Sequence, residues 1–170
     1  SGLLQFEADG YGNVVTYEYD TKGRLEWVLD RERHPVEYHQ YEEKVLTDAN
    51  SYNKHTVRTA LVEDMSKDDV ANASNSSLDI QHSVSYSDGM GRFRQSIEYN
   101  TSPLPLERIR HAEYDHFGRE AEKYLPYFDN ITGSDSYITN ARSETLNYYS
   151  NQFDDNENTT HPYSKTEFEA

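Results

Sequence analysis

The residue types that most often carry chemistry form few groups in this chain. His111, Glu113 and Asp115 alternate along one expected strand, so their side chains would project from the same face. Imidazole and carboxylate groups bind divalent ions, which makes this triplet a candidate metal site. The competing interpretation is a solvated or cross-strand-paired face. We favour it because one strand supplies poor tetrahedral geometry, and we expect neither a bound metal nor a cofactor.

Two further groups match no known site. His34, Glu37 and His39 surround an expected turn, but their spacing fits no metal motif. The acidic run Asp154–Asn158 lacks the alternating aspartates, glycine and distal glutamate of a calcium loop, so a solvated acidic loop is expected there. The chain also has no nucleophile elbow, phosphate-binding loop or glutamate flanked by paired histidines. We therefore expect no enzymatic activity, and an unrecognised hydrolase is only a third hypothesis.

Composition limits how such a chain can fold and what it can bind. Hydrophobic residues make up only 34% of the 170 residues, and 15 residues are tyrosine. Burial must therefore come largely from packed aromatic rings. The formal net charge of -15 argues against nucleic acid and anionic membranes as partners. There is no cysteine for a disulfide, and no apolar run is long enough for a membrane span.

The elements that would position these residues are indicated by a repeated phrase. Copies lie at Tyr19–Arg24, Tyr86–Arg92 and Tyr114–Arg119, each flanked by strand-like residues. Asp can bond its own backbone in a turn, Gly permits positive φ, and Tyr favours a half-buried pleated surface. We predict a β-hairpin at each copy, with neighbouring hairpins stacked on one another. Because one unit has Arg33-His34 in place of its glycine and the Tyr86 copy has an extra residue, we expect both to turn differently.

The sequence resembles the bacterial YD-repeat, or rearrangement-hotspot (RHS), family. The resemblance rests on D-x-x-G-N at 9–13 and Y-x-Y-D-x-x-G-R-L at 17–25, together with the later copies. It implies an internal fragment of a mainly β protein in which antiparallel hairpins form part of a coiled strip or shell. The glycines would permit the turns, the tyrosines would build an interstrand ladder, and the arginines would hold adjacent units together. These structural residues are Tyr19, Asp20, Gly23, Arg24, Tyr86, Asp88, Gly91, Arg92, Tyr114, Asp115, Gly118 and Arg119.

The same resemblance implies a non-catalytic structural role in a secreted or cell-surface protein. Its partners would be the remaining repeats of the same polypeptide and an encapsulated C-terminal toxin domain, or another cell through contact. Any export signal would lie upstream of this fragment. The alternative function is a carbohydrate-binding surface module, in which exposed aromatic rings stack on a glycan. Its candidate residues are Tyr17, Tyr19, Trp27, Tyr38 and Tyr41.

We expect the chain to be organised in four segments. Residues 3–48 form a first hairpin array, 49–79 a polar insertion or linker, 80–128 a second array, and 129–170 a turn-rich acidic tail. In the insertion, Val57, Ala60, Leu61 and Met65 share a helical face, which predicts a short helix over 55–65. The tail is expected to carry an amphipathic helix over 141–153 and a terminal strand over 161–168.

Overall fold

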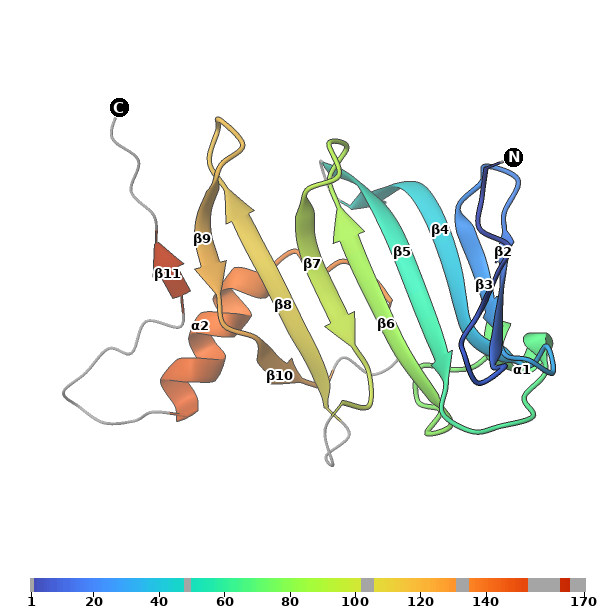
Figure 1. The fold of residues 1–170 in the computed structure, drawn as a ribbon. Coiled ribbons are helices and arrows are strands. Elements are labelled where there is room, and N and C mark those ends of the chain that lie inside the picture. Colours follow the sequence, from blue (N-terminus) through green and yellow to red (C-terminus); the bar gives the residue numbers. More distant parts are fainter. Residues whose placement is uncertain (1, 48–49, 102–105, 131–134, 153–162, 166–170) are drawn as a thin grey trace.

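The protein is built mainly from antiparallel strands, as expected from the sequence (Figure 1). The computed structural model describes residues 2–47, 50–101, 106–130, 135–152 and 163–165. The helices are α1 (Lys67–Ala71) and α2 (Ala141–Gln152). The strands are β1 (Phe6–Ala8), β2 (Val14–Tyr19), β3 (Leu25–Leu29), β4 (Pro35–Thr47), β5 (Asn50–Ala60), β6 (Ile80–Ser87), β7 (Phe93–Glu98), β8 (Glu107–Tyr114), β9 (Glu120–Tyr124), β10 (Tyr127–Asp129) and β11 (Tyr163–Lys165).

From β1 to β9 each strand pairs with the next strand of the chain, so this part of the sheet is an open meander. The order from one edge to the other is β1-β2-β3-β4-β5-β6-β7-β8-β9-β11. β9 and β10 share the outer edge of β8, where β9 pairs with residues 112–114 and β10 with residues 107–109. The pairing of consecutive strands requires only short connections, and among the described strands β1 and β11 lie at the two ends of the sheet.

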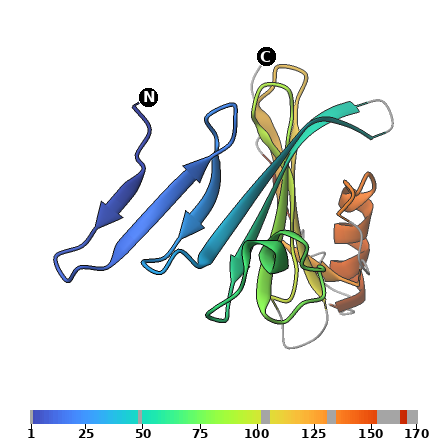
Figure 2. The ribbon, with the colours of Figure 1, turned by 90° about the vertical axis from the view of Figure 1, so that its right-hand side faces the viewer.

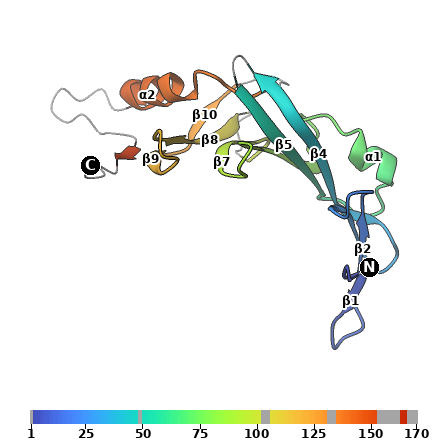
Figure 3. The same ribbon diagram turned by 90° about the horizontal axis from the view of Figure 1, so that it is seen from above.

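The two faces of the sheet differ in what lies on them. Both described helices lie on one face, and at its β1 end the sheet curves away from them (Figures 2 and 3). We call this the covered face and the other the open face. No helix among the described residues is long and apolar enough to cross a membrane.

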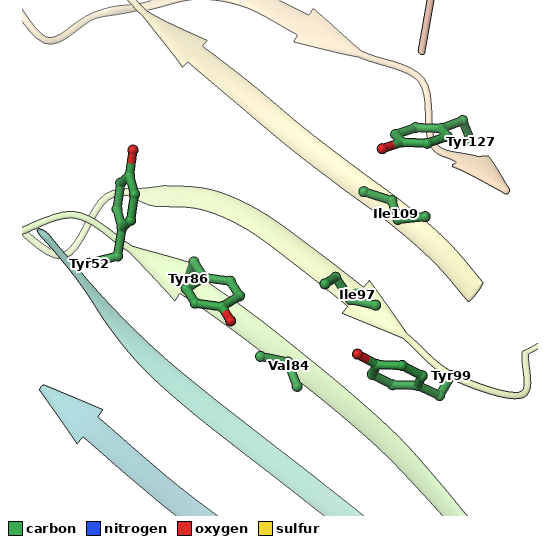
Figure 4. Packing of buried hydrophobic residues seen from close by; sticks show 7 residues of the cluster. All are labelled: Tyr52, Val84, Tyr86, Ile97, Tyr99, Ile109 and Tyr127. Carbon is green, nitrogen blue, oxygen red and sulfur yellow. The ribbon is translucent and has the colours of Figure 1, made fainter. Parts of the chain in front are cut away.

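The larger core lies on the covered face and is rich in tyrosine, as the composition predicts. It contains Tyr52, Val84, Tyr86, Ile97, Tyr99, Ile109 and Tyr127 (Figure 4). Tyr137, Ile138, Tyr148 and Tyr149 from the α2 region pack against this cluster. A second cluster joins Trp27, Leu29 and Ile80 to Val70 of α1. Aromatic rings thus supply much of the buried area that aliphatic side chains supply in most domains.

A strap of residues 135–140 fixes the α2 region to the sheet through polar contacts. The buried Gln95 side chain accepts a hydrogen bond from the Ile138 amide at 2.8 Å and donates one to the Ile138 carbonyl at 3.0 Å. The Tyr86 hydroxyl donates to the Asp135 carbonyl, and Lys54 lies 3.7 Å from the Asp135 carboxylate. Buried polar groups need such partners because an unpaired one is costly.

The helix predicted over residues 55–65 is wrong. Residues 50–60 instead form β5, which pairs with β4 on one side and β6 on the other. The buried side chains of β5 include Thr56 and Arg58, whereas Val57 points to the opposite face. The spacing of the apolar residues therefore indicated the wrong buried face. Pairing with β4 on one side and β6 on the other determines that residues 50–60 form a strand. The helix of this region is α1, which begins after a capping box at Ser66 and Asp69.

The helix predicted in the tail is confirmed as α2. Its buried side chains are Ala141 and Thr145, and the partly buried Tyr148 and Tyr149 pack on the core. The apolar face expected from the sequence consists of Leu146, Tyr149 and Phe153, of which Tyr149 packs on the core and Phe153 lies outside the described residues. β11 lies within the predicted terminal strand, whereas the acidic run Asp154–Asn158 lies outside the described residues.

Ile97 provides a test of this core. Its side chain is fully buried and lies between Val84 of β6 and Ile109 of β8. Ile97→Ala should lower the free energy of unfolding by about 2–5 kcal/mol, because it removes buried methyl groups and leaves a cavity. Val62→Ala, at an exposed position, is the control and should change stability by less than about 0.5 kcal/mol. Urea denaturation followed by circular dichroism measures both, and equal effects would contradict the assigned core.

Candidate functional site

The aspartate of each repeated phrase caps the turn of its hairpin. In the first copy, Asp20 Oδ1 accepts the backbone N–H groups of Lys22 at 2.8 Å and Arg24 at 2.9 Å. Asp20 Oδ2 accepts a hydrogen bond from Arg24 Nε at 2.7 Å. The Gly23 amide donates to the Asp20 carbonyl at 2.9 Å, and Gly23 has a φ of 78°. The aspartate side chain thus organises the turn, and glycine fits because its backbone lies in the left-handed region.

The same geometry occurs in every described turn of this sequence type. In each, the carboxylate accepts amides two and four residues later and contacts the side chain of the fourth residue. The turns begin at Asp9, Asp20, Asp30, Asp88 and Asp115. Four of them show a register shift in the adjoining ladder. The hairpin is therefore one structural unit that recurs along the sheet.

The two units expected to turn differently make this same turn. Arg33 occupies the glycine position with a φ of 69°, and its amide donates to the Asp30 carbonyl at 3.1 Å. In the later copy, the extra residue Ser87 lies in β6 before the turn, so the turn itself has the common length. The carboxylate cap overrides the preference of arginine for negative φ.

The extra residue changes the face on which a tyrosine lies. Side chains alternate between faces along a strand, so one added residue moves the preceding side chain to the other face. Tyr86 is accordingly buried in the core, 1% exposed, whereas Tyr19 and Tyr114 remain half-buried beside their turns. The Tyr19 hydroxyl donates to the Leu4 carbonyl at 2.6 Å. The repeated tyrosines are therefore not equivalent.

Two of the repeated arginines reach from their own turn to the next strand. Arg24 Cζ lies 4.4 Å from the centre of the Tyr41 ring on β4, and Arg92 Cζ lies 4.8 Å from the Tyr114 ring on β8. Each arginine also pairs with the aspartate of its turn. Arg119 pairs with Asp115 and lies 5.1 Å from the Phe117 ring of its own turn. Arg24 and Arg92 thus connect neighbouring hairpins by cation–π contacts.

The residues of the candidate metal triplet are not brought together. His111 is 4% exposed, stacks on Tyr124, and forms a hydrogen bond of 2.9 Å with Thr145 of α2. The Glu113 carboxylate lies 3.8 Å from Arg94, and the Asp115 carboxylate caps its turn. Within the described ranges, no three or more His, Cys, Asp or Glu side chains are gathered so as to hold a metal.

The candidate sugar-binding rings mostly stack on other protein groups. Trp27 is 8% exposed, and its ring centre lies 4.3 Å from that of Tyr38. Lys67 Nζ lies 5.1 Å from the centre of the same Trp27 ring. Tyr41 stacks on both Arg24 and His55. The Tyr17 hydroxyl donates to Glu7 at 3.3 Å. A ring whose face is already stacked, as in Trp27, Tyr38 and Tyr41, cannot offer that same face to a sugar.

A row of polar and aromatic side chains crosses the open face from the β2–β3 turn to β4 and β5. We call it the open-face row; it consists of Arg24, Tyr41, His55, His39 and Glu37. The Tyr41 and His55 rings are 4.4 Å apart and nearly parallel, at 4°. His39 Nδ1 lies 3.1 Å from His55 Nε2, and His39 Nε2 lies 3.3 Å from Glu37 Oε2. A groove of about 430 Å³ adjoins the row and is lined by Lys54, Asn53 and Ser87 besides Arg24, Tyr41 and His55.

Sequence reasoning grouped His39 with His34 and missed His55. His39 and His55 are neighbours because Tyr41 pairs with His55 and His39 with Val57 across the β4–β5 ladder. Burial, followed by the neighbouring His39 and Arg24, lowers the pKa of His55 below its usual value. The lowered pKa favours the neutral form of this histidine, whose Nε2 forms a hydrogen bond with His39 Nδ1.

The fold and the repeated turn define a class of protein: an open antiparallel sheet of aspartate-capped hairpins. The sequence model of the family described as a domain of unknown function (DUF6443) matches residues 58–170. The match covers more than half of the 170 residues, so the chain belongs to this family. No match was found among curated proteins or among solved structures. The matched region begins within β5, and aspartate-capped turns lie on both sides of that boundary.

The two glycines of one turn provide an internal test of the cap. Gly91 has a φ of 78°, whereas Gly89 has ordinary backbone and open space around it. Gly91→Ala should cost about 1–2 kcal/mol of stability because an L-residue is strained at that φ. Gly89→Ala should cost less than about 0.5 kcal/mol, and Arg33→Gly should be neutral or stabilising. Thermal and urea denaturation of the three variants measure this, and similar losses at Gly91 and Gly89 would show that the turn is wrongly assigned.

Buried His82 predicts a loss of stability in acid. Its side chain is 1% exposed, it stacks on Tyr99, and neither ring nitrogen has a partner within the described residues. Burial lowers the pKa of His82 to about 4. The unfolded chain, with a histidine pKa of about 6.5, therefore binds more protons, so stability should fall as the pH drops from about 6.5 toward 4.

His82→Phe keeps a ring against Tyr99 and removes this protonation. Between pH 7 and pH 5 it should lose on the order of 2 kcal/mol less stability than the wild type does. His116→Gln, which removes an exposed histidine, is the control and should follow the wild-type profile. The midpoints of urea denaturation, measured at several pH values for the wild type and both variants, compare these stability profiles. A wild-type profile for His82→Phe would mean that His82 does not titrate as a buried group.

Proposed function

We propose that the chain is a non-catalytic structural segment of a bacterial secreted or cell-surface YD-repeat (RHS-like) protein. In this role the strip of hairpins forms part of a shell or scaffold. Neighbouring hairpins of the same polypeptide extend the sheet, and the finished wall encloses a C-terminal toxin domain or mediates contact between cells. The chain contributes stability and shape rather than a reaction.

The observation that carries the proposal is the recurrence of one turn along a continuous sheet. The aspartate cap at Asp9, Asp20 and Asp30 lies before the matched family region, and the caps at Asp88 and Asp115 lie within it. The sheet continues through that boundary because β5 pairs with β4 and β6. A unit that repeats with the same contacts and packs on the next unit is typical of an elongated scaffold.

The β1 edge supports the extension of this sheet by another hairpin. Among the described strands, β1 pairs only with β2, which leaves its other edge without a partner. Leu3, Leu4 and Phe6 beside this edge are exposed. An exposed apolar edge is a hazard in an isolated domain, because it can pair with other chains. A neighbouring hairpin of the same polypeptide would remove that hazard.

Two measurements test the proposed function. Electron cryo-microscopy of the natural polypeptide that carries this chain should show the β1 edge paired with another hairpin in a wall that surrounds an interior. A β1 edge exposed to solvent in that polypeptide would contradict the shell. A glycan array probed with the purified chain should show no saturable binding, because the Trp27, Tyr38 and Tyr41 rings already stack on protein groups. Saturable binding that Tyr17→Ala abolishes would instead support the carbohydrate-binding module.

A further inference from the structure

Two buried histidines lie beneath the segment that covers the aromatic core. We call this segment, residues 135–152, the cover; it comprises the strap and α2. Its side chains on the core are Tyr137, Ile138, Tyr148 and Tyr149. His82 of β6 and His111 of β8 are both buried on the covered face. Each of them meets a different part of the cover, so the protonation of either ring is linked to its attachment.

His111 contacts α2 directly. Thr145 Oγ1 donates its one hydrogen to a carbonyl one turn earlier in α2, so it accepts the 2.9 Å hydrogen bond from His111 Nε2. The second nitrogen, Nδ1, is buried without a partner within the described residues, and an added proton would have to bind there. Burial, followed by Arg142 of α2 and Arg94 of β7, lowers the pKa of His111 to about 4, whereas Glu122 of β9 acts in the opposite direction.

His82 lies next to the strap. It stacks on Tyr99, whose hydroxyl hydrogen-bonds to the Asp135 carboxylate. Neither ring nitrogen of His82 has a partner in the described part of the chain, so a charged ring would bury two unpaired N–H donors. Burial lowers the pKa of His82 to about 4. Asp135 opposes this shift, whereas Arg58 and Lys54 of β5 add to it, and the Asp135 carboxylate already lies 3.7 Å from Lys54.

We propose that the cover is an acid-released latch: protonation of His82 and His111 detaches residues 135–152 from the sheet and exposes the aromatic core, while the hairpins stay paired. In the released state both rings meet water, so below about pH 6.5 this state binds more protons than the closed one. The closed state is therefore favoured above that pH and is lost as the pH falls toward 4. The proposal is independent of the scaffold role, since it concerns only the covered face.

The hairpins have no such dependence in this pH range. Their turns are held by aspartate carboxylates, and the Arg24 amide keeps the pKa of the Asp20 carboxyl below its usual value. This cap therefore stays ionised between pH 6.5 and pH 5, where the buried histidines of the covered face become protonated on release. The two parts of the molecule should respond differently to the same change in pH.

Hydrogen exchange of the wild type, measured by mass spectrometry and corrected for the intrinsic rate at each pH, tests the latch. Between pH 7.5 and pH 5 the protection of the α2 amides should fall by more than ~100-fold, because each histidine shifts the opening equilibrium by about 30-fold. At pH 5 the amides of β5 and β6 should remain more than ~10-fold better protected than those of α2. Equal protection of α2 and these strands at pH 5 would mean that the whole chain opens together, and would overturn the proposal.

Two substitutions separate the histidines from other causes. His82→Phe keeps a ring against Tyr99, and His111→Gln keeps a donor for Thr145, but neither new side chain titrates. Each should reduce the fall in α2 protection by about 30-fold, and the double variant should nearly abolish it. His116→Gln, at an exposed position, is the control and should behave like the wild type. An unchanged fall in the double variant would contradict the latch.

A titration of the wild-type imidazoles by NMR does not depend on how well the variants fold. His82 and His111 should remain neutral while α2 is attached and should take up protons at the pH at which α2 loses protection. Protonation of both rings near pH 6.5 with α2 still protected would overturn the proposal.

Discussion

The aspartate cap of the tight turns is the interaction on which the rest of this structure depends. One carboxylate oxygen satisfies two backbone amides that a five-residue loop would otherwise leave without partners. The other oxygen holds the side chain four residues later, which in Arg24 and Arg92 is a guanidinium that reaches a tyrosine on the next strand. Asp20 consequently has a lowered pKa, mainly because the Arg24 amide hydrogen-bonds to its carboxylate. A single side chain thus closes the turn, sets the register and connects neighbouring hairpins.

The tyrosine-rich core imposes a second constraint, because each buried ring carries a hydroxyl that needs a partner. Carbonyls outside the strands supply it for two of these rings: Tyr86 donates to the Asp135 carbonyl of the strap, and Tyr149 of α2 donates to the carbonyl of Pro126, between β9 and β10, at 2.6 Å. The buried Tyr127 hydroxyl has no hydrogen-bond partner within the described residues. The buried Gln95 amide also needs partners, and it makes two hydrogen bonds to Ile138. The α2 region is therefore a necessary part of a sheet whose core is aromatic, and it lies within the family match.

Features with local causes could be predicted from the sequence, and those set by distant partners could not. The hairpins at residues 19–24 and 114–119 follow from aspartate and glycine at fixed spacing. The position of α2 could be predicted, but not its buried face, which carries Ala141 and Thr145. β5 could not be predicted because its buried face carries the polar residues Thr56 and Arg58, which become internal only when β5 pairs with β4 and β6. The turn at Arg33 shows that the carboxylate cap, and not glycine alone, determines the backbone. The proximity of His39 and His55 depends on the β4–β5 register, which no local pattern encodes.

The position of the open-face row gives it a mechanical role. β4 and β5 are the longest strands of the sheet, with 13 and 11 residues, and they join the early hairpins to the region matched by the family. Their ladder contains a register irregularity between Glu42 and Val45, where pairing is locally interrupted. The stack of Arg24, Tyr41 and His55 crosses from the β2–β3 turn to β5 just before that point. Side-chain contacts thus reinforce the junction near the place where backbone pairing is weakest, and the hydrogen bond between the His39 and His55 rings adds a further link between the same two strands.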